Sequence, residues 1–173
     1  MCSVPLHERF SFVKTGVQFV PVDAIDRLRV NAFIASRWLD TVMVIRGKAV
    51  DMTRVEGIVA MEADELVGLV TYVVHDDVLE ITSLDAVAQG QGIGTALLTK
   101  VIQLAHERGC AKVIVVTTND NIQAIRFYQK QGFDMARLYH NSILQARMLK
   151  PQIPMLGEEG IPLKHEIEFE MFI

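Results

Sequence analysis

Hydrophobic and polar positions along the chain follow two periods, the two-residue period of strands and the longer period of helices. Turn-forming residues separate the apolar runs that predict strands, at 17–22, 57–62, 66–74, 78–87 and 112–117. The segments 57–62 and 66–74 predict a hairpin with its turn at 63–65. Another strand is expected from Phe133, and the apolar run 41–45 has no assigned role.

Helical periodicity predicts four helices between these strands. The most regular one begins at Ile93 and is followed by Gly109, a typical C-terminal cap. A helix over 23–36 is expected, capped by Asp23. Its predicted apolar face consists of Ile25, Leu28, Ala32 and Phe33. Asn119 or Asp120 is expected to cap the next helix, which ends at Gly132, and a short helix is expected over 141–150.

The C-terminal part differs in composition from the rest of the chain. Residues 151–162 contain three prolines and two glycines, which predicts a loop. The final segment 166–171 alternates strictly and predicts a half-buried strand, with Glu166, Glu168 and Glu170 on the solvated face. The element order predicts an α/β fold with a mixed sheet, in a single domain over 1–173 with extensions at 1–16 and 142–173.

Composition narrows the classes of function. The formal net charge of −4 gives no general attraction to nucleic acid or anionic lipid. We find neither a signal-peptide core at the N-terminus nor an uncharged apolar run of the length that spans a bilayer. Two cysteines, Cys2 and Cys110, do not form a disulfide framework or a metal cluster. We therefore expect a cytoplasmic protein without a metal, a nucleic-acid partner or a membrane partner.

A glycine-rich turn over 89–94 lies between a predicted strand and the helix that starts at Ile93. A helix N-terminus presents unpaired backbone N–H groups and a partial positive charge, so this turn predicts an anion site, most naturally for phosphate. The turn lacks the Gly-Lys-Ser/Thr ending of a Walker loop. It also departs from the dinucleotide fingerprint, because the third glycine position is Thr95 and the next strand ends in Thr117 and Thr118.

Two motifs resemble those of the GNAT superfamily of N-acetyltransferases. The pattern Gln-x-x-Gly-x-Gly is met by Gln89, Gly92 and Gly94 and resembles the acetyl-CoA loop of that family. After the next strand, the family pattern Asn-x-x-Ala-x-x-x-Tyr-x-x-x-Gly-Phe is matched at every position, by Asn121, Ala124, Tyr128, Gly132 and Phe133. Seven residues of helix place Asn121 and Tyr128 on one face, about 10 Å apart along the axis.

The resemblance covers about residues 17–139 and implies both a fold and a ligand. It implies a mixed, largely antiparallel sheet with splayed central strands and flanking helices. It also implies acetyl-CoA as co-substrate, with backbone amides of the loop on the pyrophosphate and the preceding strand beside the pantetheine. The residues expected to bind it are Leu84, Asp85, Ala86, Val87, Gln89, Gly90, Gln91, Gly92, Ile93, Gly94, Thr95, Asn121, Ala124 and Tyr128.

The family implies direct acetyl transfer to a primary amine of a small molecule or peptide in a ternary complex, which leaves Cys110 without a nucleophilic role. Tyr128 is the candidate acid for the departing thiolate, because a tyrosine hydroxyl can donate a proton. Glu80 is the candidate general base, on the strand face that alternation assigns to Val78, Glu80, Thr82 and Leu84. The nearby turn 75–77 offers His75, Asp76 and Asp77 as alternatives.

The acceptor site and the assembly state are less closely defined by these motifs. The resemblance places the acceptor site at about residues 31–54 and from 139 onward, where Trp38 either walls the pocket or packs structurally. A homodimer is possible. The chain could instead bind acyl-CoA without catalysis, as a sensor or interaction domain, and a nucleotide-binding oxidoreductase is a third class that Thr95 disfavours.

Overall fold

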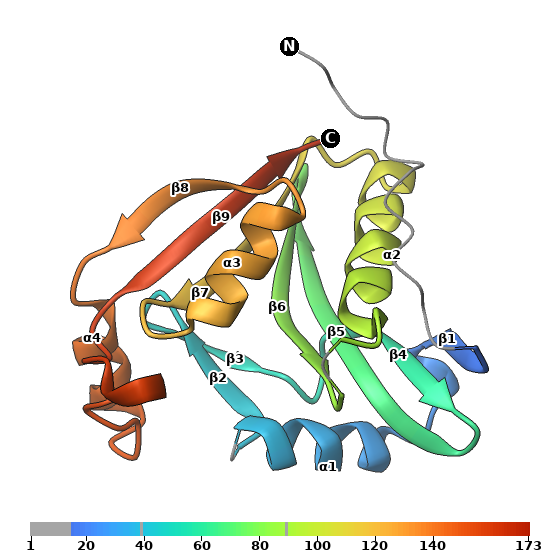
Figure 1. Ribbon diagram of the computed structural model, residues 1–173, viewed down its shortest axis with the longest axis horizontal. Coiled ribbons are helices and arrows are strands. Elements are labelled where there is room, and N and C mark those ends of the chain that lie inside the picture. Colours follow the sequence, from blue (N-terminus) through green and yellow to red (C-terminus); the bar gives the residue numbers. More distant parts are fainter. Residues whose placement is uncertain (1–14, 39, 89) are drawn as a thin grey trace.

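A seven-stranded sheet forms the centre of the protein in a computed structural model that describes residues 15–38, 40–88 and 90–173 (Figure 1). The strand order is β1-β4-β5-β6-β7-β9-β8. The strands of this sheet are β1 (Val17–Pro21), β4 (Glu56–Glu62), β5 (Glu65–His75), β6 (Val78–Ala86), β7 (Lys112–Thr118), β8 (Asp134–Tyr139) and β9 (Glu166–Phe172). Every neighbouring pair is antiparallel except β6 and β7, so the predicted mixed, largely antiparallel sheet is confirmed.

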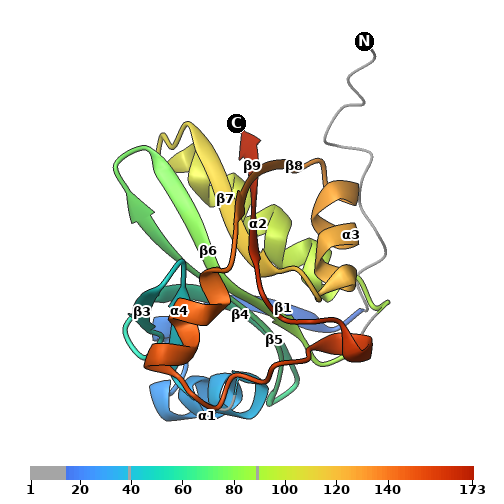
Figure 2. The same cartoon turned by 90° about the vertical axis from the view of Figure 1, so that its left-hand side faces the viewer.

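The two faces of the sheet carry different elements (Figure 2). Helices α2 (Ile93–Glu107) and α3 (Ile122–Lys130) cover one face, and their buried side chains join Leu79, Ile81 and Phe169 in the larger core. The opposite face carries helix α1 (Arg27–Trp38), helix α4 (Ser142–Leu149) and the hairpin of β2 (Val42–Ile45) and β3 (Lys48–Asp51). The hairpin gives the apolar run 41–45 its role.

The central strands β6 and β7 pair over only part of their length. Their parallel register runs from Val78 opposite Lys112 to Ile81 opposite Val115. Beyond this point β6 continues to Ala86 and β7 to Thr118, but no β6–β7 pair is formed. The strands therefore diverge, as expected, and α2 and α3 lie on either side of the opening (Figure 1).

A β-bulge corrects the predicted faces of β6. Tyr72 pairs with Ile81 and Thr71 pairs with Ser83, so Thr82 is an extra residue in the ladder. The bulge reverses the alternation, and Leu84 packs with the core beside Leu79 and Ile81 rather than on the face of Glu80. The hydroxyl of Thr71 bonds to both Thr82 Oγ1, at 2.8 Å, and Ser83 Oγ, at 2.7 Å, which satisfies the buried polar groups at the bulge.

The start of α1 also differs from the sequence-based expectation. A 3-10 turn, η2 (Val22–Ala24), precedes the helix, and Asp26 rather than Asp23 caps it by accepting a hydrogen bond from the Leu28 amide. Val30 and Ile34 are the buried residues of this helix, whereas Leu28 is 75% exposed and Ala32 is also exposed. The predicted positions of Leu28 and Ala32 on the apolar face were therefore wrong.

The cap of α3 is another correction. Asn121 caps the helix, because its Oδ1 accepts a hydrogen bond of 2.9 Å from the Ala124 amide. Asn119 and Asp120 hold the C-terminal loop instead. Asn119 Oδ1 accepts from the amides of Lys164 and His165, and Asp120 Oδ2 accepts from the amide of Glu158. Both side chains satisfy loop amides that no regular element would pair.

The glutamates of β9 are not on a solvated face. Glu166 and Glu168 are 3% and 8% exposed. Arg46, at the turn of the β2–β3 hairpin, lies over them: its backbone N–H donates to Glu166, and its guanidinium contacts Glu168 at 3.4 Å and Glu80 at 2.7 Å. The alternation predicted the strand correctly, but it could not show that a distant hairpin covers the polar face.

Within the described part of the chain, none of the helices combines the length and the apolar character needed to cross a lipid bilayer.

Candidate active site

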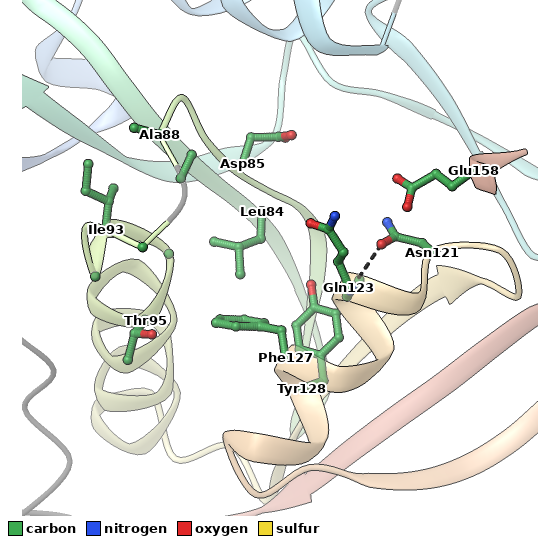
Figure 3. Close-up of a pocket in the computed structure, with 15 residues that line it drawn as sticks. Leu84, Asp85, Ala88, Ile93, Thr95, Asn121, Gln123, Phe127, Tyr128 and Glu158 are labelled. Carbon is green, nitrogen blue, oxygen red and sulfur yellow. Dashed lines mark hydrogen bonds between the residues drawn. The ribbon is translucent and has the colours of Figure 1, made fainter.

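An open cleft of about 570 Å³ lies where β6 and β7 diverge, between the N-terminus of α2 and helix α3 (Figure 3). Two features produce the cleft. The parallel pairing of β6 and β7 ends at Ile81, and the turn before α2 contains several glycines. The lining consists of residues from β6, the turn, α2, α3 and the C-terminal loop: Leu84, Asp85, Ala86, Ala88, Gly90, Gly92, Ile93, Gly94, Thr95, Asn121, Gln123, Ala124, Phe127, Tyr128 and Glu158.

The N-terminus of α2 forms the polar end of this cleft. Gly92 caps the helix with φ 74°, a left-handed conformation that strains any residue with a β-carbon. The first-turn amides of Ile93, Gly94 and Thr95 have no partners within a helix, so they are available to an anion. A β-carbon on Gly94 would meet only Phe127 Cζ, at 4.0 Å, so this glycine keeps space open on the cleft side.

These features fit a pyrophosphate. The helix dipole and the unpaired amides supply positive potential, and the glycines let the anion approach the backbone closely. Gln89, the first residue of the motif, lies outside the described residues. Val87 and Gln91 were predicted to bind the ligand and do not line the cleft, whereas the other predicted residues of this region do.

Tyr128 reaches the cleft from α3. Its ring packs against Phe127, Phe133 and Phe169 with centroid separations of 5.3, 5.8 and 5.8 Å, and the residue is only 6% exposed. Its hydroxyl points into the cleft toward Leu84 (Figure 3). Burial, with a smaller contribution from the charge of Asp85, raises the pKa of Tyr128, so the hydroxyl keeps its proton and can donate it.

Asn121 lies about two helical turns before Tyr128 and lines the same cleft, as the seven-residue spacing predicted. Its Oδ1 is used to cap α3. The Nδ2 group of this side chain is therefore the part that can donate to a ligand.

Asp85 lines the cleft from the other direction, on the sheet face that carries α1. Trp38 Nε1, at the end of α1, donates a hydrogen bond of 2.8 Å to Asp85 Oδ2. Burial raises the pKa of Asp85, while the Trp38 donor and the nearby charge of Arg37 act in the opposite direction. Trp38 itself is not among the residues that line the cleft, but its indole holds a carboxylate that is.

Glu80 occupies a different place. It lies on the same sheet face as Asp85, but it is not among the lining residues of the cleft, and its carboxylate is bonded to Arg46 at 2.7 Å. The turn residues His75, Asp76 and Asp77 are exposed and also lie outside the lining.

Sequence reasoning missed four lining residues: Ala88, Gln123, Phe127 and Glu158. Phe127 and Gln123 flank motif positions on α3, so helical spacing could have identified them. Glu158 lies in the 3-10 turn η3 (Glu158–Gly160) of the C-terminal loop, whose position depends on the hydrogen bond between its amide and Asp120. No local pattern in the sequence signals that contact.

Comparison with known proteins gives the family. The acetyltransferase (GNAT) family model matches residues 26–133. Two Bacillus subtilis proteins that are named as uncharacterized are similar over nearly their whole length: YxbD is 38% identical over 87% of this chain and 96% of its own, and YdhI is 37% identical over 89% and 97%.

Solved structures have the same fold. An IAA acetyltransferase from Bacillus cereus superposes with a TM-score of 0.66, at 22% identity, over 91% of this chain and 98% of its own. A GNAT family acetyltransferase from Elizabethkingia anophelis, solved with acetyl-CoA bound, gives a TM-score of 0.64 at 22% identity, over 92% of this chain and all (100%) of its own.

The splayed sheet, the glycine-lined helix start and the buried tyrosine define an acyl-CoA-dependent acyltransferase fold. The chain belongs to the GNAT acetyltransferase family.

Proposed function

We propose that this protein is an N-acetyltransferase that moves the acetyl group of acetyl-CoA directly to a primary amine of a small molecule or peptide. The observation that carries the proposal is the convergence, in one cleft, of an anion-binding helix start and a protonated, buried tyrosine. An acyl thioester with a pyrophosphate needs both features, one at each end.

The amides of Ile93, Gly94 and Thr95 would hold the pyrophosphate, and β6 from Leu84 to Ala86 would pair with the pantetheine through its backbone. The hydroxyl of Tyr128 would give its proton to the departing sulfur. Asn121 would orient the pantetheine through its Nδ2 group. The sequence proposes Glu80 as the general base, but its carboxylate is bonded to Arg46 and lies outside the cleft lining.

An amine acceptor is supported by the charges at the cleft. Among the described residues that line it, the ionisable carboxylates are Asp85 and Glu158, and none is a lysine or an arginine. Two carboxylates attract an alkylammonium, the form in which a primary amine is present at neutral pH. The acidic lining therefore favours a cationic acceptor over an anionic one.

Substitution of Gly94 tests the ligand. Gly94→Asp adds a carboxylate at the cleft, where it should exclude a pyrophosphate, yet an acidic residue in the first turn is compatible with the helix. Thr99→Asp, on an exposed position of the same helix, is the matched control. Calorimetry with acetyl-CoA should show binding to the wild type and to Thr99→Asp but not to Gly94→Asp. Equal binding by all three would remove this helix start from the site.

Substitution of Tyr128 tests the chemistry. Tyr128→Phe keeps the aromatic packing and removes the acid, so kcat should fall about 10²- to 10⁴-fold while acetyl-CoA affinity changes little. The assay is thiol release with a panel of amines, polyamines, aminoglycosides and peptide N-termini. A wild type that binds acetyl-CoA and releases no thiol with any amine would instead favour a non-catalytic acyl-CoA sensor.

A further inference from the structure

The proposed acetyl transfer requires a proton acceptor at the cleft, and the carboxylate of Asp85 lies there. The sequence predicted only that Asp85 binds the ligand. Asp85 lines the cleft at the point where β6 leaves β7, with Leu84 and Ala86 as its neighbours in the lining. Because of the bulge at Thr82, its side chain points to the face of α1, opposite to the core face of Leu84.

The side chain is held in one orientation. Trp38 Nε1 donates to Asp85 Oδ2 at 2.8 Å, which leaves Oδ1 as the oxygen that can accept from a ligand. Asp85 also lies near enough to Tyr128 for its charge to act on the tyrosine hydroxyl. The carboxylate and the hydroxyl thus approach one cleft from β6 and from α3 (Figure 3).

We propose that Asp85 is the catalytic base, taking a proton from the ammonium group of the acceptor as the amine attacks the thioester. This inference rests on the proposed acetyl transfer. The ammonium N–H bond breaks and its proton goes to the Asp85 carboxylate. The freed nitrogen lone pair forms the C–N bond, the C–S bond breaks, and the sulfur takes the Tyr128 proton. The second proton leaves the acetylated nitrogen and returns to the Tyr128 oxygen, and Asp85 then releases its proton to solvent, so charges and protons balance and no further reactant is needed.

The environment of Asp85 suits a base. Burial disfavours the charged carboxylate, which makes it a stronger proton acceptor than a solvated aspartate. The charged and titratable groups around it are Arg37 on α1, Tyr128 on α3 and, across the cleft, Glu158 on the C-terminal loop. None of these three groups forms an ion pair or hydrogen bond with the Asp85 carboxylate, whereas Arg46 forms an ion pair with Glu80 at 2.7 Å.

Asp85 and Glu80 differ in their bonding partners and in their position relative to the cleft. The Glu80 carboxylate is bonded to Arg46 and lies outside the cleft lining, whereas Asp85 lines the cleft and has only a neutral donor. These positions favour Asp85.

The test is a pH profile of kcat/KM for the wild type, Asp85→Asn and Glu80→Gln, with an amine that the wild type acetylates. Asparagine can still accept the Trp38 hydrogen bond through its amide oxygen, so Asp85→Asn removes the base with little change in shape. We expect a loss of about 10²- to 10⁴-fold near neutral pH. The deficit should shrink as the pH rises, because more of the amine is then already deprotonated. Glu80→Gln should keep the acid limb of the wild type.

A second variant checks the same carboxylate without replacing it. In Trp38→Phe the donor to Oδ2 is lost, and because that donor stabilises the charged carboxylate, the pKa of Asp85 should rise further. Protonation inactivates a base, so the acid limb should move to higher pH. Thermal unfolding and acetyl-CoA calorimetry on each variant show that the fold and the first substrate's binding persist.

The outcomes separate the two proposals. An active wild type with an Asp85→Asn variant that retains the rate and the acid limb would overturn the role of Asp85 alone, as would loss of the acid limb in Glu80→Gln. A wild type that transfers acetyl to no amine would overturn the proposed function, and this inference with it.

Discussion

Replacement of Arg46 by methionine should destabilise the protein strongly, although Arg46 lies in a hairpin turn and does not belong to the larger core. The guanidinium contacts Glu80 at 2.7 Å and Glu168 at 3.4 Å, and the side chains are 25% exposed for the arginine and 10% for each glutamate. Methionine keeps most of the side-chain length and the backbone donation from residue 46 to Glu166, so the change removes mainly the positive charge.

The magnitude follows from burial. Removing one partner of a buried ion pair costs about 3–5 kcal/mol, because the remaining charge is left without compensation. The partial exposure of Arg46 lets water screen the glutamates, which lowers the expected loss to about 2–3 kcal/mol. For a chain of this length each kcal/mol shifts Tm by about 2–4 °C, so the shift should be about 4–12 °C.

Chemical and thermal unfolding of Arg46→Met measure this loss, with Arg54→Met as the matched control. Arg54 is 88% exposed and lies 3.7 Å from Asp51, so its loss should stay within about 0.5 kcal/mol. In a double-mutant cycle, Arg46→Met should cost much less once Glu80 is glutamine, because one uncompensated charge is gone. Equal unfolding curves for Arg46→Met and Arg54→Met would refute the reasoning that the cluster depends on this cation.

Three further substitutions test local features by their effect on unfolding. Asn121→Ala removes the cap of α3 and should cost about 1 kcal/mol, measured as a Tm decrease of about 2–4 °C; no change would show that the cap is dispensable. Gly57→Ala would place a β-carbon 2.5 Å from the Val70 carbonyl oxygen, so denaturant titration should show a loss of about 1–3 kcal/mol, and an unaltered midpoint would contradict this packing. Thr71→Val leaves the hydroxyls at the bulge without their shared partner and should cost about 1–3 kcal/mol by the same titration, whereas a neutral result would mean that they pair elsewhere.

Local patterns predicted the elements that build the cleft. The period change at Ile93 located α2, and the spacing of Asn121 and Tyr128 placed both on one wall of the cleft. These features depend on neighbours within a few residues, so the sequence states them directly.

The errors concern long-range contacts. The bulge at Thr82 arises from pairing with β5, and it moved Leu84 to the opposite face from Glu80. The burial of Glu168 depends on Arg46, which lies 122 residues earlier in the chain. Periodicity contains no information about which distant group covers a strand, so these side chains looked solvated.

The divergence of β6 and β7 has a consequence for the tendency of the protein to aggregate. Beyond Ile81, β6 keeps β5 on one side but has no hydrogen-bonded strand among the described elements on the other, which amounts to a sheet edge in the interior of the molecule. Exposed edges of this kind template the addition of foreign strands and promote aggregation. Here α2 and α3 flank the edge, so an approaching strand from another chain meets helices first (Figure 1). The fold can thus keep a vacant pairing position for a small extended ligand while limiting access for polypeptides.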